Sequence, residues 1–214
     1  MHVELCESVR RADLALASTD LDSKPALLRL VHFADEADRP TPRHVHRVAS
    51  LSEALALHVG WAADDARALR TAATLHDIGK AGLPRELLSA DRQLTAEERA
   101  RMELHTLLGA AVFAGVRTSP LRTARLVALH HHERWDGRGY PHRLKGERIP
   151  EAARIVAIAD VYDALATDRP YRRALPHAHV LDHISQWAGN HFDPDLSAAF
   201  LQVVRDLPSA REAA

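Results

Sequence analysis

Residues 74–82 read TLHDIGKAG and bring a His, an Asp and a Lys together at the end of a predicted helix. Residues 64–75, just before it, have apolar positions at the three-and-four spacing of an amphipathic helix, which Gly79 is expected to stop. This pattern places His76 and Asp77 on the last helical turn. Adjacent helical residues point about 100° apart, so these side chains can reach two points but cannot both grip one.

Such a pair suits a site that holds two metal ions. The His supplies a ligand to one ion, and a carboxylate with two oxygens can bridge both ions. Lys80, just past the turn, would add a positive charge beside a bound anion. A His-Asp dipeptide is also common as surface polar residues or as a helix cap, so the rest of the chain has to decide.

Length and composition predict one globular domain with a short extension. The chain has 214 residues, 46% of them hydrophobic, which is enough to bury a full core. Its net charge of −1 does not favour non-specific binding to nucleic acid or to an anionic membrane. An anionic substrate would therefore have to be held by a local site.

The sequence also predicts a cytoplasmic protein without a membrane anchor. Cys6 is the only cysteine, so no internal disulfide can form, and the first residues lack the apolar core of a signal peptide. The most apolar stretch, residues 154–166, is interrupted by Asp160 and Asp163 and is too short to cross a bilayer. The chain has 15 histidines, which could be metal ligands or scattered surface residues.

Helical patterns follow one another along the chain, and no alternating strand pattern is found, so the predicted fold is an all-α helical bundle. Residues 1–39 are interpreted as a helical lead-in that packs on the main domain or offers a surface to a partner. The next helix has Thr41 as N-cap and Pro42 at its first position. Thr95 and Glu98 predict a capping box. Further helices are expected over residues 84–90, 95–102, 102–115, 120–132, 151–167, 176–189 and 195–207. Residues 134–150 read as a long, functional loop.

Candidate metal ligands recur at intervals of roughly 26 to 32 residues, each on its own helix or helix end. About 28 residues suffice for one helix and a return of similar length, so successive helices can bring their side chains to one level of a bundle. These candidates are His44, His76, Asp77, His105, His131, His132 and Asp160.

Imidazole and carboxylate ligands without thiolate favour iron, manganese, nickel or zinc, and iron or manganese suits six-fold coordination best. The expected cofactor is therefore a pair of divalent ions, Fe or Mn. The alternative, that these are unrelated core and surface residues, has to explain why acids interrupt apolar helices. Burying Asp160 without a partner would cost several kcal/mol.

The chain resembles the HD-GYP subgroup of the HD superfamily of metal-dependent phosphohydrolases over roughly residues 40–201. The matching segments stand in the order HVHRVA, LHDIGKAGLP, MELHTLLGA, ALHHHERWDGRGYP, LKGERIPEAARIVAIADVYDAL, TDRPYRRA and HFDP. Each alone would be a weak signal, but the ordered set is specific. The resemblance divides the chain into a lead-in, residues 1–39, and an HD-GYP domain, residues 40–214.

The resemblance implies a helical bundle around two or three metal ions and a phosphodiesterase that hydrolyses the bacterial messenger cyclic di-GMP. It makes the seven candidates the metal ligands, with Asp77 bridging and catalytic and Lys80 on the substrate phosphate. Substrate contacts are implied for the name-giving Gly139, Tyr140 and Pro141 and for the basic pair Arg169 and Arg172. In the family, the loop with the tripeptide shapes the pocket and contacts diguanylate cyclase (GGDEF-type) partners.

The chain departs from the family at three positions. Pro42 stands where Gly is common, and Thr106 stands where Pro is common; both are local backbone changes. Pro40 stands where some members place a glutamate before the first ligand, which favours two ions and a linear pGpG product, with further hydrolysis to GMP left open.

Two rival interpretations are an HD hydrolase of another nucleotide and a non-catalytic cyclic di-GMP-responsive module. The intact GYP loop and the complete ligand set argue against them. The sequence does not define the oligomeric state, but it is compatible with a homodimer.

Overall fold

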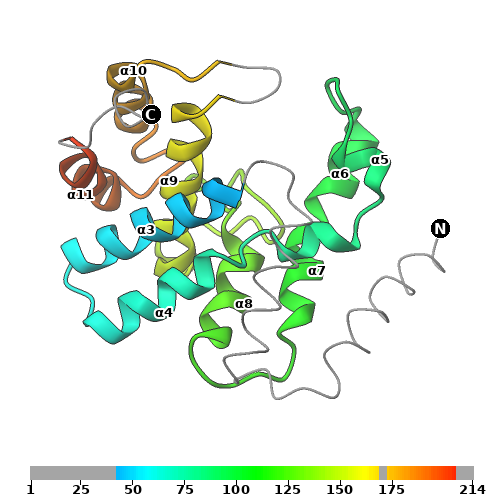
Figure 1. Cartoon of the computed structure of the whole chain (residues 1–214), viewed down its shortest axis with the longest axis horizontal. Helices are drawn as coiled ribbons and strands as arrows, with labels where there is room; N and C mark the ends of the chain where they lie inside the picture. The colour runs from blue at the N-terminus through cyan, green and yellow to red at the C-terminus, as the bar shows by residue number, and fades with distance from the viewer. Residues whose placement is uncertain (1–41, 169–172, 206–214) are drawn as a thin grey trace.

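The computed structural model describes residues 42–168 and 173–205. These two ranges are helical and contain no strand, apart from an isolated bridge between Ala188 and Phe192 (Figure 1). The all-α prediction is therefore confirmed. The lead-in, the Thr41 cap, Arg169 and Arg172 lie outside the described residues, so the predicted domain division stays a prediction.

The helices occur where the apolar patterns predict them, with ends that differ by a few residues. In chain order they are α3 (Pro42–His58), α4 (Ala63–Ala73), η1 (Ile78–Gly82), α5 (Arg85–Leu88), α6 (Ala96–Glu103), α7 (His105–Val112), α8 (Leu121–His130), η2 (Gly146–Arg148), α9 (Glu151–Ala166), α10 (His177–Gln186) and α11 (Pro194–Val204). Residues 134–150 are irregular except for η2, as predicted. In the described ranges, no helix combines the length and apolar character needed to cross a bilayer.

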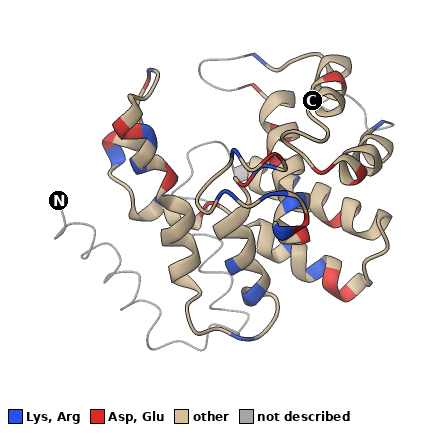
Figure 2. Cartoon of the chain, turned by 180° about the vertical axis from the view of Figure 1, so that it is seen from behind, with Lys and Arg blue, Asp and Glu red and all other residues tan. Residues whose placement is uncertain are grey.

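The core lies where α3, α4, α8 and α9 pack on one another, at the centre of Figure 1. The predicted stripe of α3 faces inward, because Val45, Val48 and Leu55 are all buried. The helices α10 and α11 lie on one side of this core, and α5 and α6 lie on the other side (Figure 1). Figure 2 shows basic and acidic residues interspersed along α3, α4 and α6, in keeping with the low net charge.

His76 and Asp77 were predicted to lie on the last turn of a helix, but they follow the end of α4. The helix α4 ends at Ala73, and the following amides donate to the carbonyl three residues back, as in the 2.9 Å bond from Lys80 N to Asp77 O. Beyond this tighter backbone, Asp77 faces His105 at the start of α7, and the His76 ring lies between those of His44 and His131. A Cβ on Gly79 would lie 1.9 Å from the carbonyl oxygen of His105, so glycine is required by the contact with α7.

The helix predicted over residues 102–115 begins three residues later than expected. The helix α6 ends at Glu103, and α7 begins at His105. At the junction, Leu104 N bonds to Arg101 O at 3.2 Å, a spacing of three residues that breaks the α-helical series. The predicted capping box of α6 is confirmed. The break turns α7 onto η1 and sets His105 at the start of its helix.

Candidate metal centre

The seven candidate ligands come from distant parts of the sequence and lie together in two adjacent groups, which we call the central cluster. One group is Asp77, His105, His131 and His132, and the other is His44, His76 and Asp160. Within each group, the possible ligand atoms all lie within 4.8 Å of one another. The structure therefore brings together the complete set that the sequence singled out.

Asp77 lies between the two groups, with one carboxylate oxygen facing each. Its Oδ1 is 3.2 Å from His105 Nε2 and 3.5 Å from His131 Nε2. Its Oδ2 is 3.2 Å from His76 Nε2, in the other group. This is the arrangement that a carboxylate bridging two ions requires.

Backbone carbonyls fix the orientation of three of the imidazole rings. A carbonyl oxygen can only accept a hydrogen bond, so Nδ1 of each ring carries the proton, and the lone pair on Nε2 is left for a metal ion. Such outer hydrogen bonds are usual for metal-binding histidines. The three bonds run from His76 to Ala73 at 2.8 Å, from His105 to Met102 at 2.7 Å and from His131 to Val127 at 3.0 Å.

His44 is held by a carboxylate instead of a carbonyl. Its Nδ1 bonds to Asp163 Oδ2 at 2.6 Å, and its Nε2 lies 3.4 Å from Asp160 Oδ1. Arg47 donates to the same Asp163 carboxylate at 2.5 and 3.0 Å. Burial lowers the pKa of His44, but the two carboxylates outweigh burial and raise it to about 9. An ion bound here would therefore have to displace a proton.

Two buried atoms of the central cluster have no hydrogen-bond partner among the described residues, namely His76 Nε2 and Asp77 Oδ1. A buried polar atom left unpaired costs about 1–3 kcal/mol, so native structures rarely keep one without a reason. Both atoms face the centre of the cluster and are good ligands for a divalent ion. The residues present thus fit a pair of divalent ions.

The charges around Asp77 keep its carboxylate ionised. Burial raises the pKa of Asp77, but the charge of Lys80, together with the histidines around the carboxylate, more than offsets burial and holds this pKa well below its usual range. Lys80 Nζ lies 2.5 Å from Asp77 Oδ2 and remains partly exposed. Burial also holds the pKa of His132 well below its usual range, which keeps that ring neutral and able to bind a metal ion.

The loop with the Gly139–Tyr140–Pro141 tripeptide folds back on this centre. The Tyr140 ring stacks on His132 with centroids 4.8 Å apart, and its backbone N–H donates to the carbonyl of His132 at 3.2 Å. A Cβ on Gly139 would lie 2.4 Å from the backbone nitrogen of Arg134, so this close fold needs glycine. Burial raises the pKa of Tyr140, so its hydroxyl stays protonated and can donate a hydrogen bond.

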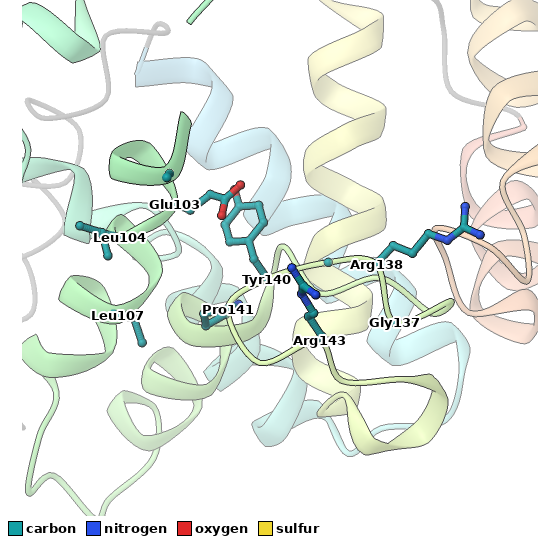
Figure 3. Close-up of a pocket in the computed structure, with 10 residues that line it drawn as sticks. Glu103, Leu104, Leu107, Gly137, Arg138, Tyr140, Pro141 and Arg143 are labelled. Carbon is teal, nitrogen blue, oxygen red and sulfur yellow. The ribbon is translucent and has the colours of Figure 1, made fainter. Parts of the chain in front are cut away.

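A pocket of about 520 Å³ opens beside the tripeptide, between the loop and the junction of α6 with α7. Gly139, Tyr140 and Pro141 all line it, as do Glu103 and Arg143. Figure 3 shows Tyr140 and Arg143 close together with Glu103 beyond the tyrosine ring, whereas the side chain of Arg138 extends away from them. Because Tyr140 stacks on His132, the pocket adjoins the central cluster.

Sequence reasoning assigned no role to Asp163 or Glu133. Asp163 lies three residues after Asp160 on α9, so the spacing of two acids on one face of an apolar helix was an available signal. Glu133 is buried, and its carboxylate accepts the backbone N–H groups of His142 at 2.7 Å and Leu144 at 3.0 Å. No sequence pattern indicated these hydrogen bonds, which connect the start of the loop to its middle.

Several known proteins have sequences similar to this chain. The chain is 36% identical over 180 residues to a 3′3′-cGAMP-specific phosphodiesterase from Vibrio cholerae, covering 84% of this chain and 34% of the relative. It is 37% identical over 182 residues to a cyclic di-GMP phosphodiesterase from Thermotoga maritima, covering 85% and 50% respectively. The chain thus spans about a third to a half of the length of these relatives.

The fold also matches solved structures. The structure of an HDG"Y"P protein from Bdellovibrio bacteriovorus superposes with a TM-score of 0.61 at 18% sequence identity, covering 94% of this chain and 62% of that chain. The sequence profile described as HD domain matches residues 27–196, which is most of the chain. The chain therefore belongs to the HD domain family, and the predicted resemblance to its HD-GYP members is confirmed.

Proposed function

We propose that this chain is a metal-dependent phosphodiesterase that hydrolyses cyclic di-GMP to linear pGpG. The observation that carries the proposal is Asp77, whose two oxygens face two groups of histidines with fixed Nε2 atoms. Relatives named as cyclic dinucleotide phosphodiesterases support the same reaction class. The chain covers 34% and 50% of the length of those two relatives.

Two divalent ions, iron or manganese, are the proposed cofactor, one held by each group of the central cluster. When bound, such ions lower the pKa of water toward about 7 and neutralise charge on phosphoryl oxygens. The absence of a thiolate in the cluster favours these metals over copper(I). The seven residues of the central cluster are the proposed ligands.

In the proposed reaction, water attacks phosphorus in line with the 3′ oxygen, and the bond between phosphorus and that oxygen breaks. Asp77 accepts the proton that the water loses, because its carboxylate is ionised and faces both groups. Lys80 places its positive charge beside the phosphate oxygens as negative charge develops there.

We propose that the pocket beside the tripeptide receives one guanine base. Tyr140 supplies a ring for stacking and a protonated hydroxyl, and the Arg143 guanidinium can bind the acceptor edge of guanine. The carboxylate of Glu103 suits the N–H groups on the opposite edge of the base. Gly139 and Pro141 shape the wall, and contacts from Arg169 and Arg172 to the substrate remain a prediction from the resemblance.

A second candidate substrate is 3′3′-cGAMP, because a relative with 36% identity is specific for it. The same cluster would cleave either molecule, since both contain 3′–5′ phosphodiester bonds. Both molecules also contain guanine, so a pocket for one guanine base would accept either of them, and discrimination would fall to the contacts around the second base. A diguanylate cyclase partner is a further prediction from the resemblance, and a pull-down would test it. A homodimer is compatible with the sequence, and a light-scattering measurement would test it.

The test is metal analysis of anaerobically purified protein, combined with chromatography of cyclic di-GMP and of 3′3′-cGAMP after incubation with the same sample. We expect about two ions of Fe or Mn per chain and conversion of cyclic di-GMP to pGpG. Asp77→Ala should reduce turnover by at least about 10³-fold. Asp91→Ala, which removes an exposed acid outside the cluster, is the matched control and should leave turnover unchanged.

Each other outcome contradicts one part of the proposal. Faster hydrolysis of 3′3′-cGAMP than of cyclic di-GMP would replace the substrate. Bound metal without hydrolysis of either molecule would exclude the phosphodiesterase, and absence of metal after reconstitution would exclude the cofactor. Full metal-dependent activity of Asp77→Ala would exclude the bridging role.

A further inference from the structure

A second group of possible metal ligands lies at the base of the loop, outside the central cluster. It consists of His130, Glu133 and His142, which we call the loop cluster. One nitrogen or oxygen from each residue lies within 4.8 Å of the others. His130 is the last residue of α8, and His142 directly follows the tripeptide, so the group joins a helix end to the pocket loop.

The buried member of this group has an unsatisfied nitrogen. His130 is 8% exposed, and its Nδ1 has no hydrogen-bond partner within the described part of the chain. That nitrogen is 3.9 Å from Glu133 Oε1, too far for a hydrogen bond. A buried imidazole nitrogen without a partner is costly, and it points at a carboxylate that an ion could share with it.

Glu133 is positioned to act as a ligand while it keeps its present contacts. Its two oxygens accept the backbone N–H groups of His142 and Leu144. Each carboxylate oxygen has two lone pairs, so one remains available on each. The same hydrogen bonds fix the backbone of His142 beside His130, and the two imidazole rings lie 5.5 Å apart between centroids.

The distances are close to those of a zinc site. Two ligand atoms about 2 Å from a tetrahedral Zn²⁺ ion lie about 3.3 Å apart, so the His130–Glu133 pair, now at 3.9 Å, has to close by only about 0.6 Å. His142 is exposed, so its side chain can turn inward to complete a set of three ligands. Two imidazoles and one carboxylate, with water in the fourth position, form a well-known Zn²⁺ ligand set.

We propose that the loop cluster is a separate binding site for a Zn²⁺-type transition-metal ion. The ion ties the end of α8 to the segment after the tripeptide and so holds the wall of the pocket in place. His130 and His131 are adjacent on the chain and point about 100° apart, so the loop cluster and the central cluster take different ions. The proposal does not depend on what the central cluster hydrolyses.

The test measures bound Zn²⁺ per chain after dialysis of full-length protein against a buffered low concentration of free Zn²⁺. His142→Ala should lose about one equivalent of Zn²⁺ relative to the wild type. The matched control is His179→Ala, which removes an exposed histidine on α10 and should bind as much as the wild type. His130→Phe, which keeps an aromatic ring but removes Nδ1, should lose the same single equivalent, with circular dichroism confirming that it folds.

A His142→Ala variant that keeps the wild-type amount of Zn²⁺ would overturn the proposal. A matching result in thermal unfolding supports it, because an ion that binds only the folded chain raises Tm. Zn²⁺ should then raise the Tm of His179→Ala more than that of His142→Ala. A defective central cluster would lower Zn²⁺ equally in all variants and would leave the difference of one equivalent intact.

Discussion

The central cluster and the loop cluster contain the same kinds of side chain but differ in what surrounds them. In the central cluster, the Nδ1 atoms of His44, His76, His105 and His131 are each bonded to a carboxylate or carbonyl oxygen. In the loop cluster, His130 Nδ1 has no hydrogen bond from the described residues, and His142 is exposed. One site is oriented before an ion arrives, whereas the other needs the ion to complete it.

The hydrogen bonds around the ligands should set how tightly each cluster binds its ion. Orienting an imidazole ring beforehand lowers the entropy cost of binding, so the outer hydrogen bonds add to affinity without touching the ion. The central cluster should therefore bind its ions tightly. It should also keep them when an exposed residue near the cluster is replaced. The loop cluster should bind more weakly and depend on each of its ligands.

Removal of the carboxylate behind His44 should give the largest change in stability. Asp163→Ala leaves the His44 Nδ1 and the Arg47 guanidinium without the partner they share. Because the carboxylate is buried, we expect the free energy of unfolding to fall by about 4 kcal/mol. Metal affinity of the central cluster should fall by about 10–100-fold. Urea denaturation and competition with a chelator measure the two effects.

Asp182→Ala is the control for this change, since it removes an exposed acid from α10. Asp163→Asn should fall between wild type and Asp163→Ala, because the amide keeps an acceptor for one donor but loses the charge. If Asp163→Ala kept wild-type metal affinity, the orientation of His44 would not contribute to the site. The contrast between the two clusters would then rest on burial alone.

Much of this arrangement could be predicted from the sequence, because ligand types and helical periods are local properties. The intervals between His44, His76, His105 and Asp160 predicted that distant helices converge, and the structure brings these residues together. The helix ends could not be predicted as well. His76 and Asp77 lie beyond α4, since close packing of η1 on α7 decides the backbone there and no local pattern reports it.

The outer partners were the part that sequence reasoning missed. Carbonyl oxygens such as those of Met102 and Val127 belong to every residue type, so no sequence pattern can mark them. Asp163 was visible as an acid in an apolar helix, but only the structure shows that it holds His44. Contacts of this kind depend on the angle between helices, which the period of a pattern does not define.

A methyl group at Gly79 should move Asp77 and His105 of the central cluster apart. The added Cβ of Gly79→Ala would meet the carbonyl oxygen of His105 at 1.9 Å and the Gly109 nitrogen at 2.4 Å, so the backbone of η1 or α7 must move. We expect a loss of about 3 kcal/mol in the free energy of unfolding. Because His105 would move away from Asp77, bound metal should also decrease.

Gly82→Ala is the matched control in the same 3₁₀ helix. Its Cβ would meet only a side-chain atom of Leu108, at 3.0 Å, and a flexible side chain can move at little cost. Denaturation and metal analysis of both variants would show whether the approach of η1 to α7 carries the effect. Equal losses in the two variants would mean that any alanine in this turn is harmful, whatever it contacts.

His191 provides a third environment for histidine and the smallest expected effect. It belongs to neither cluster, stacks on Phe192 with centroids 4.4 Å apart, and accepts a hydrogen bond at its carbonyl oxygen from Trp135 N–H in the pocket loop. Burial, followed by the charge of Arg134, lowers the pKa of His191 to about 4. In the unfolded chain, His191 has a pKa near 6.5. As the pH falls, His191 is therefore protonated in the unfolded state before it is protonated in the folded state, which favours unfolding.

The free energy of unfolding should therefore decrease by about 2.5 kcal/mol between pH 6.5 and pH 4 because of His191, and level off in this respect below about pH 3. His191→Phe keeps the stacked ring and removes the titration, so its stability should fall less over that range. Urea denaturation of both chains in the presence of a chelator removes any contribution from metal release, and His179→Ala serves as the exposed control. Equal slopes for wild type and His191→Phe would show that His191 takes up its proton at the same pH in the folded and the unfolded chain. The loop would then be held against the segment that follows α10 by its backbone hydrogen bonds to Asn190 and His191, without a requirement for a neutral histidine.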